Sequence, residues 1–147
     1  MLSQEIQEAV AAHNAARHAA QGVKRPDLVW DERLAADAQK WADHLAATGT
    51  FQHEGMRGEG ENLFMQMGGG HQPLKKGVEA WNDEKPHYHG EKIAGGNFSS
   101  YGHYTQVIWP TTTHVGMASA TAKNGHQVIV GRYSPPGNFS GKTAFEA

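Results

Sequence analysis

The sequence predicts a single α+β domain, organised as a three-layer α-β-α sandwich around a central antiparallel sheet. Helical apolar patterns fill the first half of the chain, whereas alternation with a period of two begins only near residue 115. Helices followed by a late hairpin favour this arrangement over a parallel doubly wound sheet. The 147 residues suit one core rather than two, so residues 1–147 are expected to form one domain.

Two amphipathic helices are predicted before residue 50. Ser3 can cap the first helix, which places four residues on one face: Ile6, Val10, His13 and Arg17. We expect His13, Asn14 and Arg17 to tie this helix to the rest of the domain. Asp31 can cap the second helix, which repeats apolar residues at intervals of four, three and four: Leu34, Ala38, Trp41 and Leu45. Gly49 is placed to end it.

The middle of the chain is harder to divide into elements. Residues 55–70 are rich in Gly and Met, so long regular elements are not expected there, although a short helix could hold residues 61–65. Pro73 suits the first turn of a third helix, which Pro86 would end and whose apolar side carries Leu74, Val78 and Trp81. Residues 90–102 are interpreted as a long glycine-containing loop.

The last third of the chain predicts a β-hairpin. One set of alternating residues precedes the turn: Val115, Met117, Ser119 and Thr121. Asn124-Gly125 favours a tight hairpin turn. A second set follows, in which Ile129 and Gly131 alternate with Val128, Val130 and Arg132.

Composition excludes several classes of function. The formal charge of −2 is spread without long blocks of one sign, so no basic face for nucleic acid is expected. No apolar run approaches the roughly 20 residues that span a bilayer, so at most peripheral membrane contact is expected. The chain has no cysteine, which excludes disulfides, thiol catalysis and thiolate metal ligands. The ten histidines supply ligands or groups that titrate near neutrality.

Four segments together resemble a known family. They are His-Asn-Ala-Ala-Arg at 13–17, Gly-Glu-Asn-Leu at 60–63, Gly-His-Tyr-Thr-Gln-Val-Ile-Trp at 102–109 and Arg-Tyr-Ser-Pro-Pro-Gly-Asn at 132–138. In this order they resemble the CAP superfamily of cysteine-rich secretory proteins, insect antigen 5 and plant pathogenesis-related proteins. The resemblance covers nearly the whole chain. The lack of cysteine departs from most secreted relatives and resembles a cysteine-poor branch peripheral to Golgi membranes, or a bacterial or fungal form.

The resemblance implies a central cleft lined by two His and two Glu. The matching positions are His53, Glu61, Glu84 and His103. Asp83 and Glu54 are near alternatives to Glu84. Two imidazoles can occupy two positions around Zn²⁺ or another divalent cation, and a carboxylate beside each imidazole can fix its tautomer. The histidines lie about 50 residues apart, so no local metal motif is present and only the resemblance brings them together.

Several histidines could have a structural role instead of binding a metal. His53 and His103 could be hydrogen-bonded structural residues near a cleft. His87 and His89 alternate in a loop flanked by Pro and Gly. They could extend a metal site, but a solvated pair is the preferred interpretation.

The resemblance also implies binding of fatty acids or sterols. In sterol-binding relatives, a flexible aromatic loop precedes the Gly-His-Tyr-Thr segment. The matching stretch here contains the lipid-binding candidates Tyr88, Ile93, Phe98 and Tyr101. It is poorer in aromatic residues than a good sterol loop, and charged residues make its first half polar. Met56, Met65 and Met67 could form an adaptable apolar wall, although core packing is favoured for them.

The main prediction is a non-catalytic, secreted protein that binds a small apolar ligand. A metal-dependent hydrolase or protease is the first alternative, and a defence or virulence factor acting through a protein partner is the second. The N-terminal residues lack the basic and apolar regions of a secretory signal, which leaves a cytoplasmic or membrane-peripheral location as the alternative. Residues 135–138 resemble a segment that plant relatives release as a signalling peptide, but a rigid turn is favoured.

Overall fold

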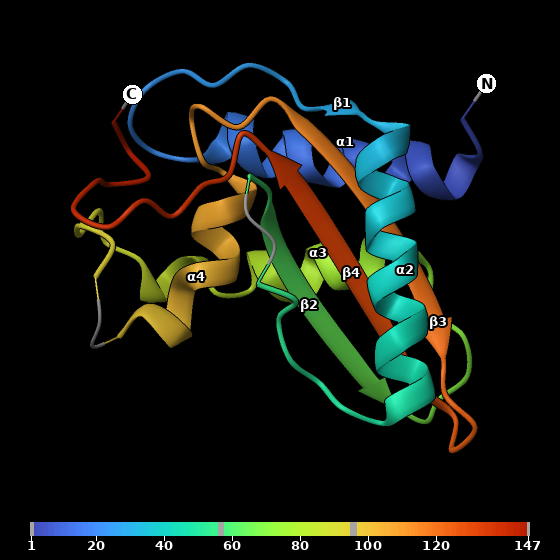
Figure 1. Cartoon of the computed structure of the whole chain (residues 1–147). Coiled ribbons are helices and arrows are strands. Elements are labelled where there is room, and N and C mark those ends of the chain that lie inside the picture. The colour runs from blue at the N-terminus through green and yellow to red at the C-terminus, as the bar shows by residue number, and fades with distance from the viewer. Residues whose placement is uncertain (1, 56–57, 95–96, 147) are drawn as a thin grey trace.

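The computed structural model describes residues 2–55, 58–94 and 97–146 (Figure 1). The α-helices of this described part are α1 (Gln4–Ala19), α2 (Glu32–Thr48), α3 (Leu74–Asn82) and α4 (Phe98–Val107). Its strands are β1 (Val29–Trp30), β2 (Gly60–Met67), β3 (His114–Thr121) and β4 (His126–Ser134). A short 3₁₀ helix, η1 (Lys85–His87), follows α3.

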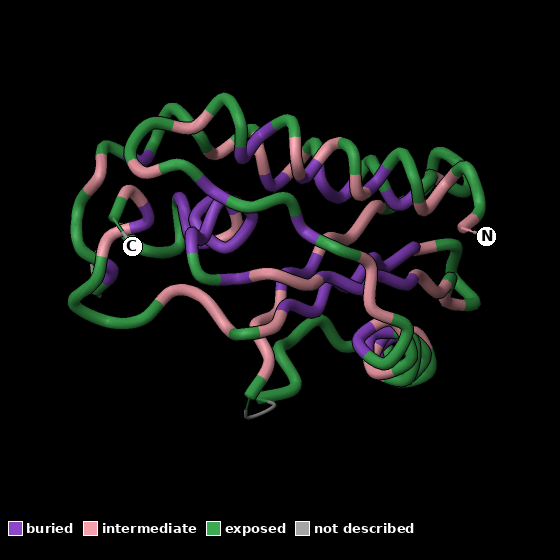
Figure 2. The backbone as a smooth tube through the Cα atoms, turned by 90° about the horizontal axis from the view of Figure 1, so that it is seen from above, coloured by how far each residue is buried: buried purple, intermediate pink, exposed green. Residues whose placement is uncertain are grey.

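The predicted three-layer sandwich is confirmed. The strand order is β1-β3-β4-β2, and β4 is antiparallel to both of its neighbours. The two-residue β1 adds a parallel pair at the edge, so the sheet is antiparallel except there. Helix α2 covers one face, and α1, α3 and α4 cover the other. Figure 2 shows the layers from above, with α2 seen nearly end-on on one side of the sheet.

Successive side chains of β4 point to opposite faces of the sheet and so pack into two separate parts of the core. Val128 and Val130 pack with the buried face of α2, whereas Ile129 and Tyr133 pack with α1, α3 and α4. On β3, Gly116 lets α2 approach closely, because an added Cβ would lie 2.2 Å from the backbone nitrogen of Ala35. The predicted hairpin is present, and its turn ends at Gly125 with a φ of 87°.

Both predicted N-terminal helices are confirmed, together with their caps. Ser3 Oγ accepts the backbone N–H of Ile6, and the Asp31 carboxylate accepts that of Leu34 at 3.0 Å. Helix α2 ends at Gly49, whose φ is 71°. These three boundaries therefore lie where a capping side chain or a left-handed glycine satisfies free backbone groups.

The side chains of α1 tie it to the rest of the domain, as expected. Arg17 is buried and donates to the carbonyl oxygens of four residues: Pro26, Val107, Trp109 and Thr112. The Asn14 side chain exchanges hydrogen bonds with the backbone of Leu28. One guanidinium thus joins α1 to the loop before β1 and to the end of α4.

The short helix predicted over residues 61–65 is wrong. Those residues belong to β2, which pairs with β4 along its whole length, from Gly60 opposite Tyr133 to Met67 opposite His126. Leu, Met, Glu and Gln favour helix locally, but pairing in a sheet overrides that preference. The expectation that residues 55–70 hold no long regular element is wrong for the same reason.

The loop predicted over residues 90–102 is also shorter than expected. Helix α4 begins at Phe98 and contains Gly102 in its interior. The Phe98 ring occupies the space beside Gly102, where an added Cβ would lie 2.8 Å from Phe98 Cζ. Glycine here makes room for an aromatic ring one helical turn earlier, and it does not break the helix.

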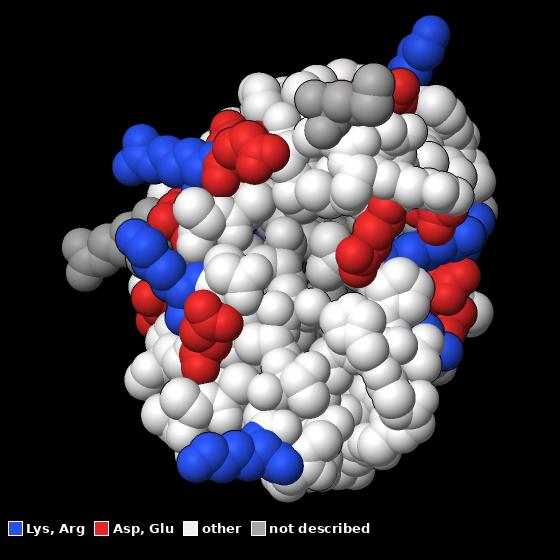
Figure 3. All heavy atoms as spheres, turned by 90° about the vertical axis from the view of Figure 1, so that its right-hand side faces the viewer, with Lys and Arg blue, Asp and Glu red and all other residues white. Residues whose placement is uncertain are grey.

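The surface carries charges of both signs. Figure 3 shows lysine and arginine side chains interspersed with acidic ones on the face it displays, without a concentrated basic patch there. In the part of the chain described, no helix is long and apolar enough to cross a bilayer.

Candidate functional site

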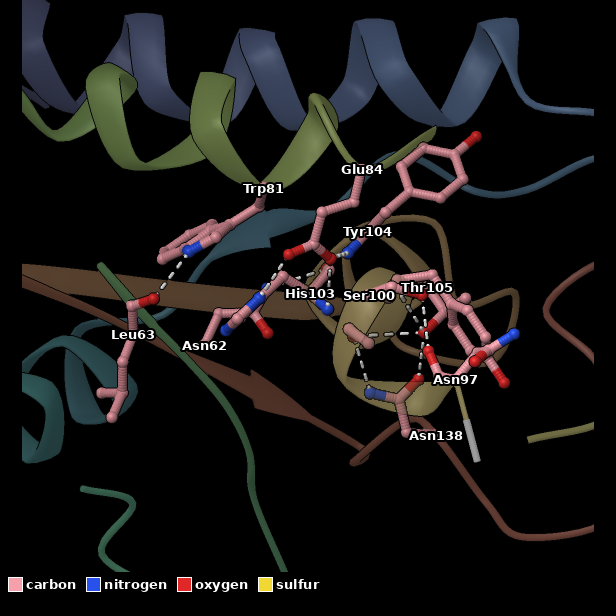
Figure 4. A network of polar contacts seen from close by, with 12 residues as sticks. Asn62, Leu63, Trp81, Glu84, Asn97, Ser100, His103, Tyr104, Thr105 and Asn138 are labelled. Carbon is pink, nitrogen blue, oxygen red and sulfur yellow. Dashed lines mark hydrogen bonds and ion pairs between the residues drawn. The ribbon is translucent and has the colours of Figure 1, made fainter. Parts of the chain in front are cut away.

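One half of the candidate site is the pair formed by His103 and Glu84. His103 lies on α4, and Glu84 follows the end of α3. His103 Nδ1 and Glu84 Oε2 are 2.7 Å apart, and Glu84 Oε1 accepts the backbone N–H groups of His103 and Tyr104 (Figure 4). The Trp81 ring lies nearly parallel to the imidazole, with the ring centroids 6.4 Å apart. Backbone groups and a buried ring therefore fix this histidine.

The other half is the pair formed by His53 and Glu61. Glu61 lies near the start of β2, and His53 lies in the segment that precedes the strand. Glu61 Oε1 accepts His53 Nδ1–H at 2.7 Å and the backbone N–H of Glu54 at 3.1 Å. The His53 side chain is 62% exposed, against 32% for His103. The His–Glu pair on the His53 side is therefore more exposed to solvent than the pair on the His103 side.

Both histidines line one cavity of about 230 Å³. Its walls come from β2, α4 and the segments before β2 and after β4, and the lining residues are His53, Glu61, Asn62, Phe98, Ser99, Gly102, His103 and Asn138. Glu84 lies behind His103 as its partner. The structure therefore brings together the four residues that the resemblance implied. Of the alternatives, Asp83 is exposed, and the Glu54 carboxylate contacts Arg132.

A buried polar chain supports the cavity from behind. Asn62 Nδ2 donates to the carbonyl oxygen of His103 at 3.0 Å and, more weakly, to the Tyr133 hydroxyl at 3.4 Å. That hydroxyl donates to His13 Nε2 at 2.7 Å, because His13 Nδ1–H is used by the Ala9 carbonyl. Burial lowers the pKa of His13 to about 4 and raises that of Tyr133. Both groups are therefore neutral near pH 7.

The Pro-Pro-Gly-Asn run closes the cavity beside α4. Asn138 donates to the Gly102 carbonyl at 2.9 Å and accepts the Thr105 hydroxyl at 2.6 Å (Figure 4). Buried Gln106 accepts the Gly137 N–H at 3.0 Å. An added Cβ at Gly137 would lie 2.7 Å from Gln106 Nε2. The sequence predicted this run as a rigid turn, and these contacts show what the turn holds in place.

Sequence reasoning missed Arg132. Arg132 was placed in an alternating strand and at the start of the 132–138 segment, with no role of its own. Its buried guanidinium contacts three carboxylates, those of Glu54, Glu59 and Glu61. Burial acts to lower the pKa of Arg132, but the hydrogen bonds that Arg132 donates to Glu54 and Glu59 outweigh burial, so the pKa is raised. The available signal was a charged residue at a strand position where Val128 and Val130 face the core.

Three of the four lipid-binding candidates lie in the core. Tyr88, Ile93 and Tyr101 are each at most 5% exposed. The Tyr88 hydroxyl donates to the carbonyl of Glu91 and accepts the N–H of Ala144, which holds the C-terminal segment. Phe98 alone lines the cavity. A lipid-binding role for these four residues stays a prediction.

The remaining candidates lie away from the cavity. His87 and His89 are exposed and do not line it. Met65 packs against the α2 side of the core, and Met67 is 74% exposed. Met56 lies outside the described residues.

The donor set limits how a metal could be held. Among the described residues, no three His, Cys, Asp or Glu side chains converge as a metal cage. His53 and His103 each use Nδ1 on a carboxylate, so Nε2 is the ring nitrogen that can bind a metal. The two imidazoles could supply only two ligands, so a cation held by them would take its other ligands from water or a bound molecule.

The pattern that defines the cysteine-rich secretory protein (CAP) family matches residues 10–133. This chain belongs to that family. It is 39% identical over 140 residues to pathogenesis-related protein 1A of Nicotiana tabacum, covering 95% of this chain and 80% of that protein. It is 38% identical over 141 residues to secreted protein RBT4 of Candida albicans, covering 95% of this chain and 37% of that longer protein.

Solved CAP structures share the fold. The crystal structure of NaASP2 with Zn²⁺ superposes with a TM-score of 0.84 at 27% identity, covering 99% of this chain and 87% of that one. Na-ASP-1 superposes with a TM-score of 0.80 at 22% identity, covering 99% of this chain and 42% of that one. The family and the fold implied by the four sequence segments are thereby confirmed.

Proposed function

We propose that this CAP domain acts outside the cell and binds Zn²⁺ or another divalent cation through His53 and His103. The observation that carries the proposal is the matched pair of Nδ1–carboxylate contacts, each 2.7 Å, on two histidines that line one cavity. A carboxylate on Nδ1 fixes the tautomer that leaves Nε2 free to bind and makes it a better ligand. A zinc-bearing structure among the CAP neighbours and a secreted relative support the proposal.

The residues around the proposed ligands suit a binding site. A bound cation would supply Lewis acidity toward a ligand oxygen. Glu61 and Glu84 orient the imidazoles, and Asn62 supports the backbone of His103 from behind. Phe98 supplies an apolar wall. We expect the cavity to bind small ligands without catalysing a reaction on them.

Calorimetric titration of Zn²⁺ into chelator-treated protein tests the metal site. The double substitution of His53 and His103 by Ala should abolish binding at the cleft. The same double substitution at His87 and His89, which are exposed and outside the cavity, is the matched control and should leave binding unchanged. Equal affinity in the wild type and the His53/His103 variant would refute the site. Peptide cleavage that depends on time and stops on chelation would favour the hydrolase alternative.

A second candidate function, fatty-acid binding, is favoured by a hollow of about 460 Å³ between α1 and α3. Its α1 wall is Glu8 followed by a stripe of small residues: Ala11, Ala12, Ala15, Ala16 and Ala19. Lys75 and Lys85 lie at its border and could pair with a carboxylate head group. The volume falls in the range of about 300–1,000 Å³ that is usual for small-molecule sites.

Binding of labelled fatty acid and labelled sterol to delipidated protein tests this second function. Ala15→Trp fills the hollow and should abolish fatty-acid binding, whereas Ala36→Trp on exposed α2 surface is the control. If Phe98→Ser abolishes binding and Ala15→Trp does not, the ligand uses the cleft and the segment before α4. If neither lipid binds the wild type, carriage of lipid is refuted and a role through a protein partner gains support.

A further inference from the structure

Arg132 joins three acidic residues at the edge of the candidate site. It is the third-last residue of β4, and its side chain is completely buried. Its Nε lies 2.8 Å from Glu61 Oε2 as an ion pair without hydrogen-bond geometry, its Nη1 donates to Glu59 at 3.0 Å, and its Nη2 donates to Glu54. Two of these carboxylates belong to the segment between α2 and β2, and the third belongs to β2 itself.

Core stability does not account for an arginine at this position. Val128 and Val130 precede it on the same face of β4, and both pack into the apolar core beneath α2. A buried ion pair is often no more stable than well-packed apolar residues of similar volume. The arginine fork does, however, impose defined directions on Glu54 and Glu59, to which it donates hydrogen bonds, and it holds the charge of Glu61 beside it.

The two oxygens of Glu61 are divided between Arg132 and the cleft. Oε2 faces the arginine Nε, whereas Oε1 accepts His53 Nδ1–H and the N–H of Glu54. Glu54, the neighbour of His53 in the chain, is held twice, through its N–H by Glu61 and through its carboxylate by Arg132. Arg132 therefore reaches His53 by two routes, although it does not line the cavity.

We propose that Arg132 is the positioning residue of the cleft: it fixes Glu61 and the segment carrying Glu54 so that His53 presents Nε2 to the cavity. The effect on metal affinity rests on the proposed function, whereas the effect on His53 itself does not. His103 provides an internal reference, because Glu84 is held by backbone N–H groups and has no arginine among its contacts in the described residues.

The test compares Arg132→Lys, which keeps the charge but loses the fork, with Arg33→Lys on exposed α2 surface. The first readout is ring ¹⁵N NMR of His53 and His103 in metal-free protein. Arg132→Lys should remove the single Nδ1–H tautomer of His53 and leave the ring shifts of His103 unchanged. The second readout is Zn²⁺ affinity, which should fall about 10- to 100-fold, as is typical when a partner of a metal ligand is lost. Arg33→Lys should change neither readout.

A combined variant covers the case in which Arg132→Lys does not fold. Arg132→Gln with Glu54→Gln and Glu59→Gln removes the guanidinium together with two of its three carboxylates, and the same shift confined to His53 is expected. Unchanged His53 ring shifts in a folded variant, or equal changes at His53 and His103, would overturn the proposal. A shift confined to His53 in a protein whose wild type binds no zinc would uphold Arg132 as the positioning residue and refute the metal site alone.

Discussion

The two halves of the cleft share one local geometry but are held in different ways. In each half, a histidine Nδ1 lies 2.7 Å from a glutamate oxygen. The Glu84 carboxylate is fixed by backbone N–H groups of α4, and its histidine lies against the ring of Trp81. The Glu61 carboxylate accepts one backbone N–H and forms an ion pair with a buried arginine, and its histidine lies on an exposed segment.

This difference shows that equal contact distances do not imply equal rigidity. Backbone donors within a helix move only if the helix moves, whereas an ion pair depends on side chains that must each be ordered. We therefore expect His103 to be a preformed ligand and His53 to be the half whose order responds to substitution. Three predictions test this contrast.

The largest effect is expected from removing the aromatic support of the rigid half. Trp81 is 2% exposed and also donates its Nε1–H to the Leu63 carbonyl. Trp81→Ala should therefore destabilise the domain by about 3–5 kcal/mol. Phe51, close to His53 in sequence, is 47% exposed, and Phe51→Ala should change stability by at most about 0.5 kcal/mol. Urea denaturation of the two variants measures both, and similar losses would remove the contrast between the halves.

The second effect concerns the buried polar chain that supports the His103 half from behind. Burial lowers the pKa of His13 from 6.5 to about 4, so between these values the unfolded chain takes up a proton that the native protein does not. Stability is therefore lost as pH falls from 6.5 towards 4, by about 3 kcal/mol in total from this group.

Chemical denaturation at a series of pH values measures this loss. His13→Gln removes the titrating ring, so its stability should depend less on pH across the same window, although the variant is less stable at neutral pH. A variant as sensitive to pH as the wild type would assign the titration to other groups.

The smallest effect, and the sharpest comparison, comes from neutralising each glutamate. Both Glu61→Gln and Glu84→Gln should weaken Zn²⁺ binding within the range of about 10- to 100-fold. Glu61→Gln should lie near the upper end, because His53 has less other support, and Glu84→Gln near the lower end, because Trp81 still holds His103. Calorimetry on the two variants ranks them, and the reverse order would show that the exposed half is the more rigid one.

The parts of the fold that local sequence determines were predicted correctly. Ser3, Asp31 and Gly49 mark the ends of α1 and α2, because each satisfies backbone groups within one turn of itself. The turn at Gly125 is equally local. Strand β2 was missed because its identity depends on β4, whose paired residues lie 59 to 73 positions further along the chain, from Met67 with His126 to Gly60 with Tyr133. Local residue preferences carry no information about a pairing strand so far away in the chain.

For the candidate site, too, features that depend on residues far apart in the chain could not be predicted from local sequence. The family resemblance identified four candidate residues: His53, Glu61, Glu84 and His103. Only the structure shows that they lie close together. The role of Arg132 was hidden because it depends on register: Glu61 lies directly opposite Arg132 across the β2–β4 pair. A shift of one residue would turn these side chains to opposite faces of the sheet. The hollow between α1 and α3 was hidden because its alanines look like ordinary packing residues.

The position of β4 has a consequence for how this protein is made. The last strand in the chain lies inside the sheet, between β3 and β2. A chain leaving the ribosome therefore exposes β2 without its partner until residue 134 has emerged. Completion of the domain is then a late, non-local step, which is slow compared with forming local contacts. Up to that point no strand joins β2 to β3, so the sheet is incomplete.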